Sequence, residues 1–384
     1  MVKKPSLFNF QKYPEEEELV IMNIIVVGKF YPESFGLHIA ETLKAMGHFV
    51  LRFEPGWRIL RDATGPFQRL RQVIGVVQEV VMRVPVIKKL DTNDLFRKCK
   101  DNRVDLILVT HDYLLPGEIA IVKRLTDAPI VLWHPDSIAS CGKFMFLNGS
   151  YDFLFFKDPY MVKVFQKELK KSAYYLPECC NPVHHRVIDL TEEDRHRYGC
   201  DITTAGNLNP NREAFFRHLS GFHVKIWGSL PPTWLDTSAI SQMIMGQYVL
   251  NEEKAKAFRA AKIVVNNLSP SEIWGLNCRA FEIPACGGFQ LVNWRPGISQ
   301  LFEDGKELVS FQDVEDLKGK VAHYLVREEE RHAIADAGFK RVQQEHTYVK
   351  RISLLLDTVA GVAKGFPLPD IRMQMMPLPS VTYR

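Results

Sequence analysis

Residues 275–297, GLNCRAFEIPACGGFQLVNWRPG, set an arginine and a glutamate in an otherwise apolar segment that ends at a double glycine. Gly275 and Asn277 can form the turn into a helix on which Arg279 and Glu282, three residues apart, share one face. A cation in the first turn opposes the helix dipole, so Arg279 should have an anionic partner such as a phosphate. A carboxylate accepts two hydroxyl hydrogens in parallel, which suits Glu282 to a ribose diol. The structural alternative is an internal Arg279–Glu282 pair that only supports packing.

A second candidate for anion binding is the segment AGNLNPNRE. Gly206 and Asn207 form a turn after a predicted strand, and Arg212 opens the next helix. This arrangement brings a guanidinium and free backbone N–H groups together, which suits a pyrophosphate. The GxGxxG fingerprint of dinucleotide-binding proteins is absent, so nicotinamide chemistry is only weakly supported.

Histidine and aspartate residues follow several predicted strands, at the edge where open parallel sheets bind ligands. His38 lies beyond the loop after the first strand, and His134 and Asp136 end the segment APIVLWHPD. Residues 110–112, Thr-His-Asp, form another such loop. Side chains of these types can act as general bases, and His38, His134 and Asp136 are the candidates. The sequence does not choose among them, and strand-end histidines often have purely structural roles.

Buried strands alternate with helices along the chain, which is typical of parallel sheets covered by helices. The predicted strands are IMNIIVVGK, FVLRFEP, VDLILVTHD, APIVLWHPD, YDFLFFKD and SAYYLPEC in the first half, and DITTAGN, HVKIWGS, IVVNNL and FQLVN in the second. A chain of 384 residues exceeds the usual size of a single core. We therefore predict an α/β protein of two Rossmann-like domains whose parallel sheets face each other across a cleft.

The predicted division of the chain has five parts. They are an N-terminal extension at 1–20, a first domain at 21–182, a polar linker at 183–200, a second domain at 201–364 and an extended tail at 365–384. Residues 69–85 have helical apolar spacing with basic side chains between. They predict an amphipathic helix that packs on the core or faces an acceptor or a membrane.

The composition indicates an ordinary globular protein, with 46% hydrophobic and 24% charged residues and a net charge of +4. Residues 52–103 carry twelve Lys/Arg against six Asp/Glu, which indicates a solvated face or a basic surface for an anionic acceptor or membrane. Seven cysteines without a Cys-x-x-Cys pair favour a reducing, cytoplasmic compartment. No apolar run predicts a signal peptide or a membrane span.

The segment WGLNCRAFEIPACGGFQLVNWRPGISQLFEDGKEL, with REEERHAIADAGFKRVQQEHTYVKR after it, resembles the C-terminal domain of CgeB-like (spore maturation protein) glycosyltransferases. That family is itself similar to the nucleotide-sugar glycosyltransferases of the GT-B fold. The resemblance is specific over about residues 245–350 and looser over 24–182. It does not extend to the N-terminal extension or the tail.

The resemblance implies roles for individual residues. Glu282 matches the second of two glutamates separated by seven residues and would bind the donor ribose, whereas Trp274 stands at the position of the first. Arg212 resembles the residue that binds the donor pyrophosphate, and His134 the histidine that touches the donor sugar. Tyr248 lies where a loop would contact the nucleobase, or is plain core.

The resemblance also implies that basic side chains, rather than a metal, stabilise the leaving diphosphate. Neither an Asp-x-Asp motif nor a histidine–cysteine cluster with zinc spacing is present in the sequence. We therefore expect a cytoplasmic glycosyltransferase without cofactor or metal, with a UDP-sugar as donor. The second domain would bind the donor, and the first a glycan, protein or small-molecule acceptor. Retention or inversion of the sugar is left open.

Three alternatives remain. A sugar-nucleotide epimerase also has two facing Rossmann-like units, but its several acid and base groups cannot be identified here. A non-catalytic assembly or binding protein that keeps the fold is favoured by Trp274 and opposed by the retained arginines and Glu282. Modification of nucleic acid would use the basic segment 52–103, and the weak net charge disfavours it.

Overall fold

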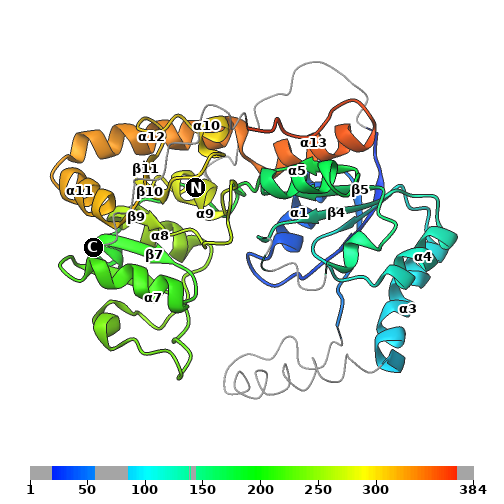
Figure 1. The fold of residues 1–384 in the computed structure, drawn as a ribbon, viewed down its shortest axis with the longest axis horizontal. Coiled ribbons are helices and arrows are strands. Elements are labelled where there is room, and N and C mark those ends of the chain that lie inside the picture. The colour runs from blue at the N-terminus through cyan, green and yellow to red at the C-terminus, as the bar shows by residue number, and fades with distance from the viewer. Residues whose placement is uncertain (1–19, 57–84, 138, 140–143, 370–384) are drawn as a thin grey trace, which may run out of the picture.

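The structure is a computed structural model that describes residues 20–56, 85–137, 139 and 144–369. Two parallel sheets lie side by side in it, each with helices on both faces (Figure 1). The first sheet has six strands and the second has five, in the orders β2-β1-β3-β4-β5-β6 and β11-β10-β9-β7-β8. The predicted α/β architecture of two Rossmann-like domains is therefore confirmed.

The first sheet is buried on both faces, as its apolar strands predict. Ile25 and Val27 point into the core beneath α3 and α4, whereas Ile24 and Val26 point into the core beneath α1. The strands are β1 (Asn23–Val27), β2 (Phe49–Phe53), β3 (Leu106–Val109), β4 (Ile130–His134), β5 (Phe153–Phe156) and β6 (Ala173–Tyr175). The helices are α1 (Phe35–Ala45), α3 (Pro85–Asp101), α4 (Pro116–Leu125), η3 (Met145–Leu147) and α5 (Pro159–Lys167).

The second sheet repeats this plan over a shorter stretch of chain. Its strands are β7 (Cys200–Ala205), β8 (Val224–Trp227), β9 (Ala261–Asn266), β10 (Gln290–Asn293) and β11 (Val309–Phe311). Its helices are α6 (Glu192–Tyr198), α7 (Pro210–Phe216), η4 (Arg217–Leu219), η5 (Ser238–Met243), α8 (Glu252–Ala260), α9 (Arg279–Ala285), α10 (Ile298–Leu301), α11 (Val314–Leu325) and α12 (Glu328–Glu345). The chain then continues into α13 (Tyr348–Val359). Strand β11 was not predicted, because only three residues of it pair with β10.

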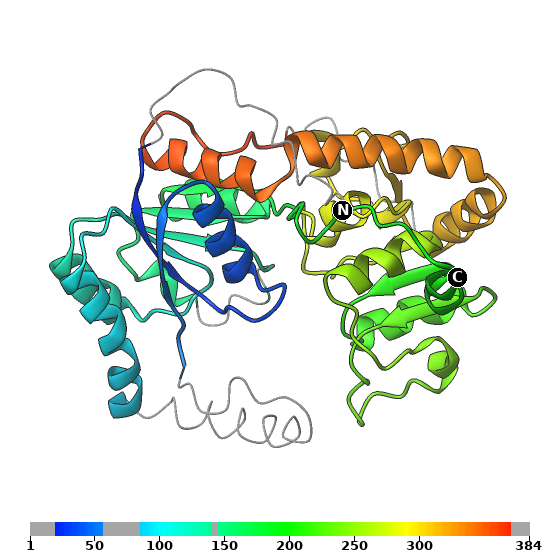
Figure 2. The same ribbon diagram turned by 180° about the vertical axis from the view of Figure 1, so that it is seen from behind.

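The C-terminal end of the second domain differs from the prediction. Residues 201–364 were assigned to one domain, but α13 leaves it and covers the first sheet beside α1 (Figures 1 and 2). Tyr348, Ile352 and Leu355 join the core that contains Ile24. The reason is that this face of the first sheet has too few helices of its own to cover it. Helix α13 thus completes the first domain.

The predicted linker also differs, since α6 forms inside residues 183–200 and β7 already begins at Cys200. Thr191 and Asp194 form a reciprocal capping box at the start of α6, and Tyr198 at its end packs on Trp227. Residues 365–369 of the predicted tail lie against the first domain, where the Phe366 N–H donates to the Tyr175 carbonyl. Most of the N-terminal extension, the amphipathic segment 69–84 and the rest of the tail lie outside the described residues.

In the part of the chain that the structure describes, no helix is both long enough and apolar enough to cross a bilayer.

Replacing Ile352 by alanine tests the return of α13 to the first domain. Ile352 is fully buried against the first sheet, so its truncation leaves a cavity and should cost about 2–5 kcal/mol of unfolding free energy. Val362, just beyond α13, is 80% exposed, and Val362→Ala should change stability by less than about 0.5 kcal/mol. Urea unfolding followed by circular dichroism measures both. Equal stability of the two variants would contradict the packing of α13.

Candidate functional site

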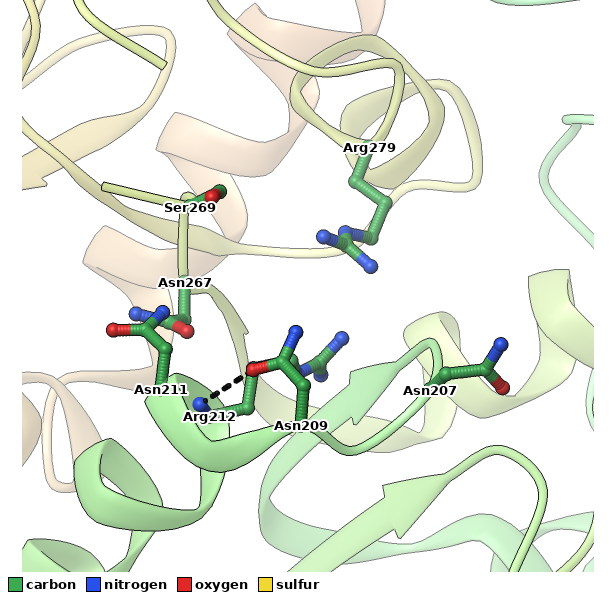
Figure 3. A pocket seen from close by; sticks show the side chains of 7 residues that line it. All are labelled: Asn207, Asn209, Asn211, Arg212, Asn267, Ser269 and Arg279. Atoms are coloured by element: carbon green, nitrogen blue, oxygen red, sulfur yellow. Dashed lines mark hydrogen bonds between the residues drawn. The ribbon is translucent and has the colours of Figure 1, made fainter. Parts of the chain in front are cut away.

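A polar pocket of about 170 Å³ opens at the carboxyl ends of β7 and β9. These are the strands between which the order of the second sheet reverses, the usual position of a ligand site in an open α/β sheet. The loop after β7 contributes one wall, and the loop after β9 and the start of α9 contribute the other (Figure 3). The lining residues are Asn207, Asn209, Asn211, Arg212, Asn267, Ser269 and Arg279.

Two arginines reach toward the same space from opposite walls of this pocket (Figure 3). A Cβ atom built on Gly206 would lie 2.4 Å from Arg279 Nη1 and 2.6 Å from Arg212 Nη1. The two guanidiniums therefore lie within about 5 Å of each other, where like charges repel. Among the described residues, no carboxylate forms an ion pair with either one. The pocket thus holds two adjacent positive charges that protein groups do not neutralise.

Arg212 is only 4% exposed, and its Nε has no hydrogen-bond partner among the described residues. Its Nη2 donates to Thr204 Oγ1 at 2.8 Å. Burial, and secondly the charge of Arg279, lower the pKa of Arg212 well below its ordinary value. A buried cation with an unsatisfied donor is costly unless an anion neutralises it. The pocket therefore suits a doubly charged anion of diphosphate size.

Neutral groups hold Arg279 in place. Its Nη1 donates to the Ala205 carbonyl at 2.7 Å, and its Nε donates to Asn266 Oδ1 at 3.3 Å. Asn277 exchanges two hydrogen bonds with Asn266 at 2.9 and 3.0 Å. Asn277, predicted to bind the donor, lies behind Arg279 and fixes Asn266, which supports it. The predicted turn glycine Gly206 has a φ of 130° and leaves the room that both guanidiniums occupy.

Glu282 is buried one turn beyond Arg279 on α9, but the two do not pair. Glu282 Oε2 accepts from Lys254 Nζ at 3.0 Å, and Oε1 lies 3.6 Å from His185 Nε2. Burial acts to raise the pKa of Glu282, but Lys254 and His185 lower it to about 2. The internal Arg279–Glu282 pair that served as the structural alternative is therefore not formed. Lys254 also contacts Glu33 of the first domain at 2.8 Å, so this carboxylate lies at the domain boundary.

The predicted donor residue Gly275 has a different role at this boundary. A Cβ on Gly275 would lie 2.6 Å from the Lys157 carbonyl oxygen and 3.0 Å from Asp158 Cα. Asp158 accepts hydrogen bonds from the backbone N–H groups of Ile273 and Trp274. The glycine thus lets the loop before α9 approach the end of β5, so it acts through domain contact. Trp274 packs edge-on against Tyr160.

Behind this contact the buried ammonium group of Lys157 lies close to two carboxyl groups. Lys157 Nζ lies 2.7 Å from Glu272 Oε1 and 3.5 Å from Glu178 Oε1, and all three side chains are buried. Burial raises the pKa of Glu178 to about 8, although the charge of Lys157 acts against it. One ammonium cannot neutralise two buried carboxylates, so Glu178 holds a proton at neutral pH.

In the first domain, the predicted residues His134 and Asp136 lie together at the carboxyl end of β4. The Asp136 N–H donates to His134 Nδ1 at 3.3 Å. His134 is 1% exposed, and burial lowers its pKa to about 4. The Asp136 side chain is 48% exposed, and its Oδ2 lies 3.4 Å from Nε2 of His111, the residue after Thr110 at the end of β3. The exposed polar atoms of this loop cluster therefore belong to Asp136 and His111.

His38 lies elsewhere, on α1 beside the crossover between the domains. It is 3% exposed, and burial lowers its pKa to about 4. His38, Glu41 and His184 have ligand atoms within 4.8 Å of one another, a spacing that a metal could use. Asn181 Oδ1 accepts from the Val183 N–H, so the amide nitrogen of Asn181 donates to His38 Nδ1 at 3.0 Å. The remaining proton of neutral His38 is then on Nε2, which leaves no lone pair for a metal.

Side-chain contacts near the pocket lie both within the second domain and between the two domains. Tyr248, half exposed rather than core, donates to Asn207 Oδ1 at 2.7 Å. Ser271 Oγ lies 2.8 Å from both Ser137 Oγ of the first domain and Ser269 Oγ of the pocket wall. The residues that follow β4 therefore border the pocket through a chain of hydroxyl groups.

The sequence analysis identified three pocket residues, Asn207, Arg212 and Arg279, and missed four. The missed residues are Asn209, Asn211, Asn267 and Ser269. Their signal was present, because they lie in NLNPN and NNLS, which overlap the carboxyl ends of two predicted strands. Asn209 caps α7 by accepting from the Arg212 N–H at 3.0 Å, and Asn267 Oδ1 has no hydrogen-bond partner in the described structure.

Solved glycosyltransferase structures share this fold. Sucrose-phosphate synthase of Thermosynechococcus elongatus is 11% identical with a TM-score of 0.62, covering 89% of this chain and 100% of that one. Anabaena HepE, solved in complex with UDP, is 11% identical with a TM-score of 0.61. The match covers 88% of this chain and 100% of that one. The protein therefore has the GT-B fold of two Rossmann-like domains.

Sequence comparison finds a matching family and a relative of this chain. The family described as glycosyl transferase-like matches residues 212–357, which include both pocket arginines. The spore protein CgeB of Bacillus subtilis (strain 168) is 26% identical over 195 residues, covering 46% of this chain and 58% of that protein. The match thus spans a little over half of that relative's length. The resemblance to CgeB-like glycosyltransferases is therefore confirmed.

The proton on Glu178 makes stability depend on pH. A carboxyl group whose pKa is raised on folding contributes stability below its unfolded pKa, and loses it as pH rises through the folded value of about 8. Wild-type unfolding free energy should therefore fall, relative to that of Glu178→Gln, by up to about 1.4 kcal/mol per pH unit between pH 7 and 8. Urea titrations at pH 6, 7, 8 and 9 measure this difference. Parallel curves for the two proteins would show that Glu178 is ionised.

Proposed function

We propose that the protein is a glycosyltransferase that moves a hexosyl group from a UDP-sugar to an acceptor hydroxyl without a metal ion. The observation that carries this proposal is the pair of unneutralised guanidiniums, Arg212 and Arg279, in the pocket between β7 and β9. Breaking the bond between sugar and diphosphate develops negative charge on the leaving group. Fixed positive charges at that position stabilise the transition state more than the ground state.

The donor has to extend beyond the pocket, because about 170 Å³ holds the diphosphate but not a whole nucleotide sugar. Glu282 stays ionised at neutral pH and keeps acceptor lone pairs, so it can bind the ribose hydroxyls beside Lys254. Tyr248, half exposed next to Asn207, can contact the base. HepE, with the same fold, was solved with UDP and with UDP-glucose, which supports the choice of donor.

The acceptor would bind to the first domain near Asp136. We propose a cytoplasmic location, because all six described cysteines are free and most are buried, as in a reducing compartment. The acceptor class is open among glycans, proteins and small molecules, and peripheral contact with a membrane is compatible with the fold.

Binding of UDP tests the donor site directly. UDP should raise the thermal unfolding midpoint in a way that EDTA does not change, whereas GDP, dTDP, CDP and ADP should act more weakly. Arg212→Gln and Arg279→Gln should each weaken UDP binding about 10- to 100-fold, since each removes a charged hydrogen bond. Arg217→Gln is the matched control, because Arg217 is exposed and pairs with Glu213 on the outer side of α7. Isothermal calorimetry gives the affinities.

The absence of a shift with any nucleotide at millimolar concentration would reject the donor site. Loss of the UDP effect on addition of EDTA would reject metal independence while preserving the site.

Gly206→Ala provides a second test of the pocket. The new methyl group would overlap both guanidiniums at a positive φ, so it should displace the arginines and reduce UDP affinity at least about tenfold. Gly221→Ala is the control, because no atom lies within 4 Å of a Cβ there. If Gly206→Ala folds with normal circular dichroism and binds UDP like the wild type, the diphosphate does not bind between these arginines.

A further inference from the structure

His111 has a backbone conformation that side chains rarely adopt. Its φ is 124°, and it is one of few non-glycine residues with positive φ in the described structure. Such strain persists only where surrounding contacts hold it, and it often marks a functional position. Here it turns the imidazole so that Nε2 lies 3.4 Å from Asp136 Oδ2. The ring also packs on Tyr113, with centroids 5.1 Å apart.

Exposure separates Asp136 from the other predicted bases. His38 and His134 are 3% and 1% exposed, so an acceptor hydroxyl cannot reach them without displacing the core. The Asp136 side chain is 48% exposed, and that of His111 is 26% exposed. A base must come within hydrogen-bond distance of the hydroxyl it activates. Asp136 meets this requirement.

Asp136 is also placed beside the proposed donor site. Its neighbour Ser137 contacts Ser271, which contacts Ser269 of the pocket wall, each at 2.8 Å between hydroxyl oxygens. An acceptor next to Asp136 therefore lies across the domain boundary from the sugar of a donor whose diphosphate fills the pocket.

We propose that Asp136 is the base that accepts the proton of the acceptor hydroxyl, and that His111 is the residue that positions it, so that transfer inverts the sugar. This inference rests on the proposed function. The acceptor oxygen forms a bond to the anomeric carbon as its proton passes to the Asp136 carboxylate. The bond from that carbon to the diphosphate oxygen breaks, and its electron pair leaves with UDP, whose charge Arg212 and Arg279 neutralise.

The charges around Asp136 support this role. Burial acts to raise the pKa of Asp136, but the hydrogen bond and charge of His111 outweigh it and lower the pKa below its ordinary value. The carboxylate is therefore ionised at neutral pH and ready to accept a proton. The titratable groups that face it are His111, His134, Lys157, Glu178, Tyr31 and Tyr113.

Methanolysis of UDP-glucose tests the inference without knowledge of the natural acceptor. Wild-type protein is incubated with UDP-glucose, whose sugar is α-linked, and molar methanol, and NMR identifies the methyl glucoside. We expect the β anomer, since direct displacement inverts the anomeric carbon. Asp136→Asn and His111→Gln should each lower kcat about 100-fold while UDP affinity stays within twofold. The double variant should be no slower than the slower single variant.

Two readouts distinguish positioning by His111 from a structural role. In His111→Gln, the acid limb of the kcat/KM profile should move to higher pH by about one unit, because Asp136 loses its partner. His111→Gly relieves the backbone strain, so it should keep or raise the thermal midpoint while it lowers kcat. His323→Gln is the matched control, because His323 forms a surface pair with Glu330 at 3.1 Å. It should change neither readout.

The α anomer, or normal rates in Asp136→Asn, would overturn the inference. So would a wild type that binds UDP but forms no methyl glucoside, and that result would preserve the donor site. A wild type that does not bind UDP would reject the proposed function, and the inference with it. An acid limb that stays in place in His111→Gln would remove His111 from the mechanism.

Discussion

The arrangement of the second domain depends on two guanidiniums held side by side without a carboxylate. The hydrogen-bond acceptors that the described residues bring to Arg212 and Arg279 are all neutral: the Thr204 hydroxyl, the Ala205 carbonyl and the Asn266 amide. Such contacts fix the geometry of a cation but leave its charge in place. Gly206 and Gly228 make the approach feasible, since a Cβ at either position would overlap a guanidinium or the Gly206 backbone. The unneutralised charge is then available to a ligand.

At the domain boundary, in contrast, the buried cations are paired with carboxylates. Lys254 is enclosed by Glu33 and Glu282, and Lys157 by Glu178 and Glu272, with one carboxylate of each pair supplied by each domain or its crossover. Buried charged clusters of this kind add little net stability, even where one member such as Glu178 holds a proton, but the removal of one partner is costly. They therefore specify how the domains meet more than how tightly they are held. The loop before α9 supplies Glu272 to one cluster, and α9 itself supplies Glu282 to the other. The relative position of the domains and that of Arg279 are therefore linked through α9.

The two-domain fold and part of the pocket could be predicted from the sequence. The strands are apolar on both faces, and the edge of a parallel sheet that binds ligands follows from its topology. Arg212, Arg279 and Asn207 were found by that logic. The support that Asn277 gives to Arg279 through Asn266 was not predicted. An asparagine that binds a ligand and one that supports an arginine look alike in sequence. Glu282 was expected to be free or paired with Arg279. Its partners Lys254 and His185 come from segments 28 and 97 residues away, which no local pattern indicates. The same limit hid the return of α13.

The choice among the histidines shows what a strand-end rule leaves undecided. His111 follows β3 and His134 ends the neighbouring strand β4, and their rings lie 5.5 Å apart. His134 is enclosed by Phe146 and Phe156, and burial keeps it neutral. His111 has a positive φ and is turned outward to meet the Asp136 carboxylate. Both are histidines at the carboxyl edge of the same sheet, but His134 is the last residue of β4 and His111 lies two residues beyond β3. The direction of each side chain decides which histidine meets Asp136, and the order of the strands does not encode that direction.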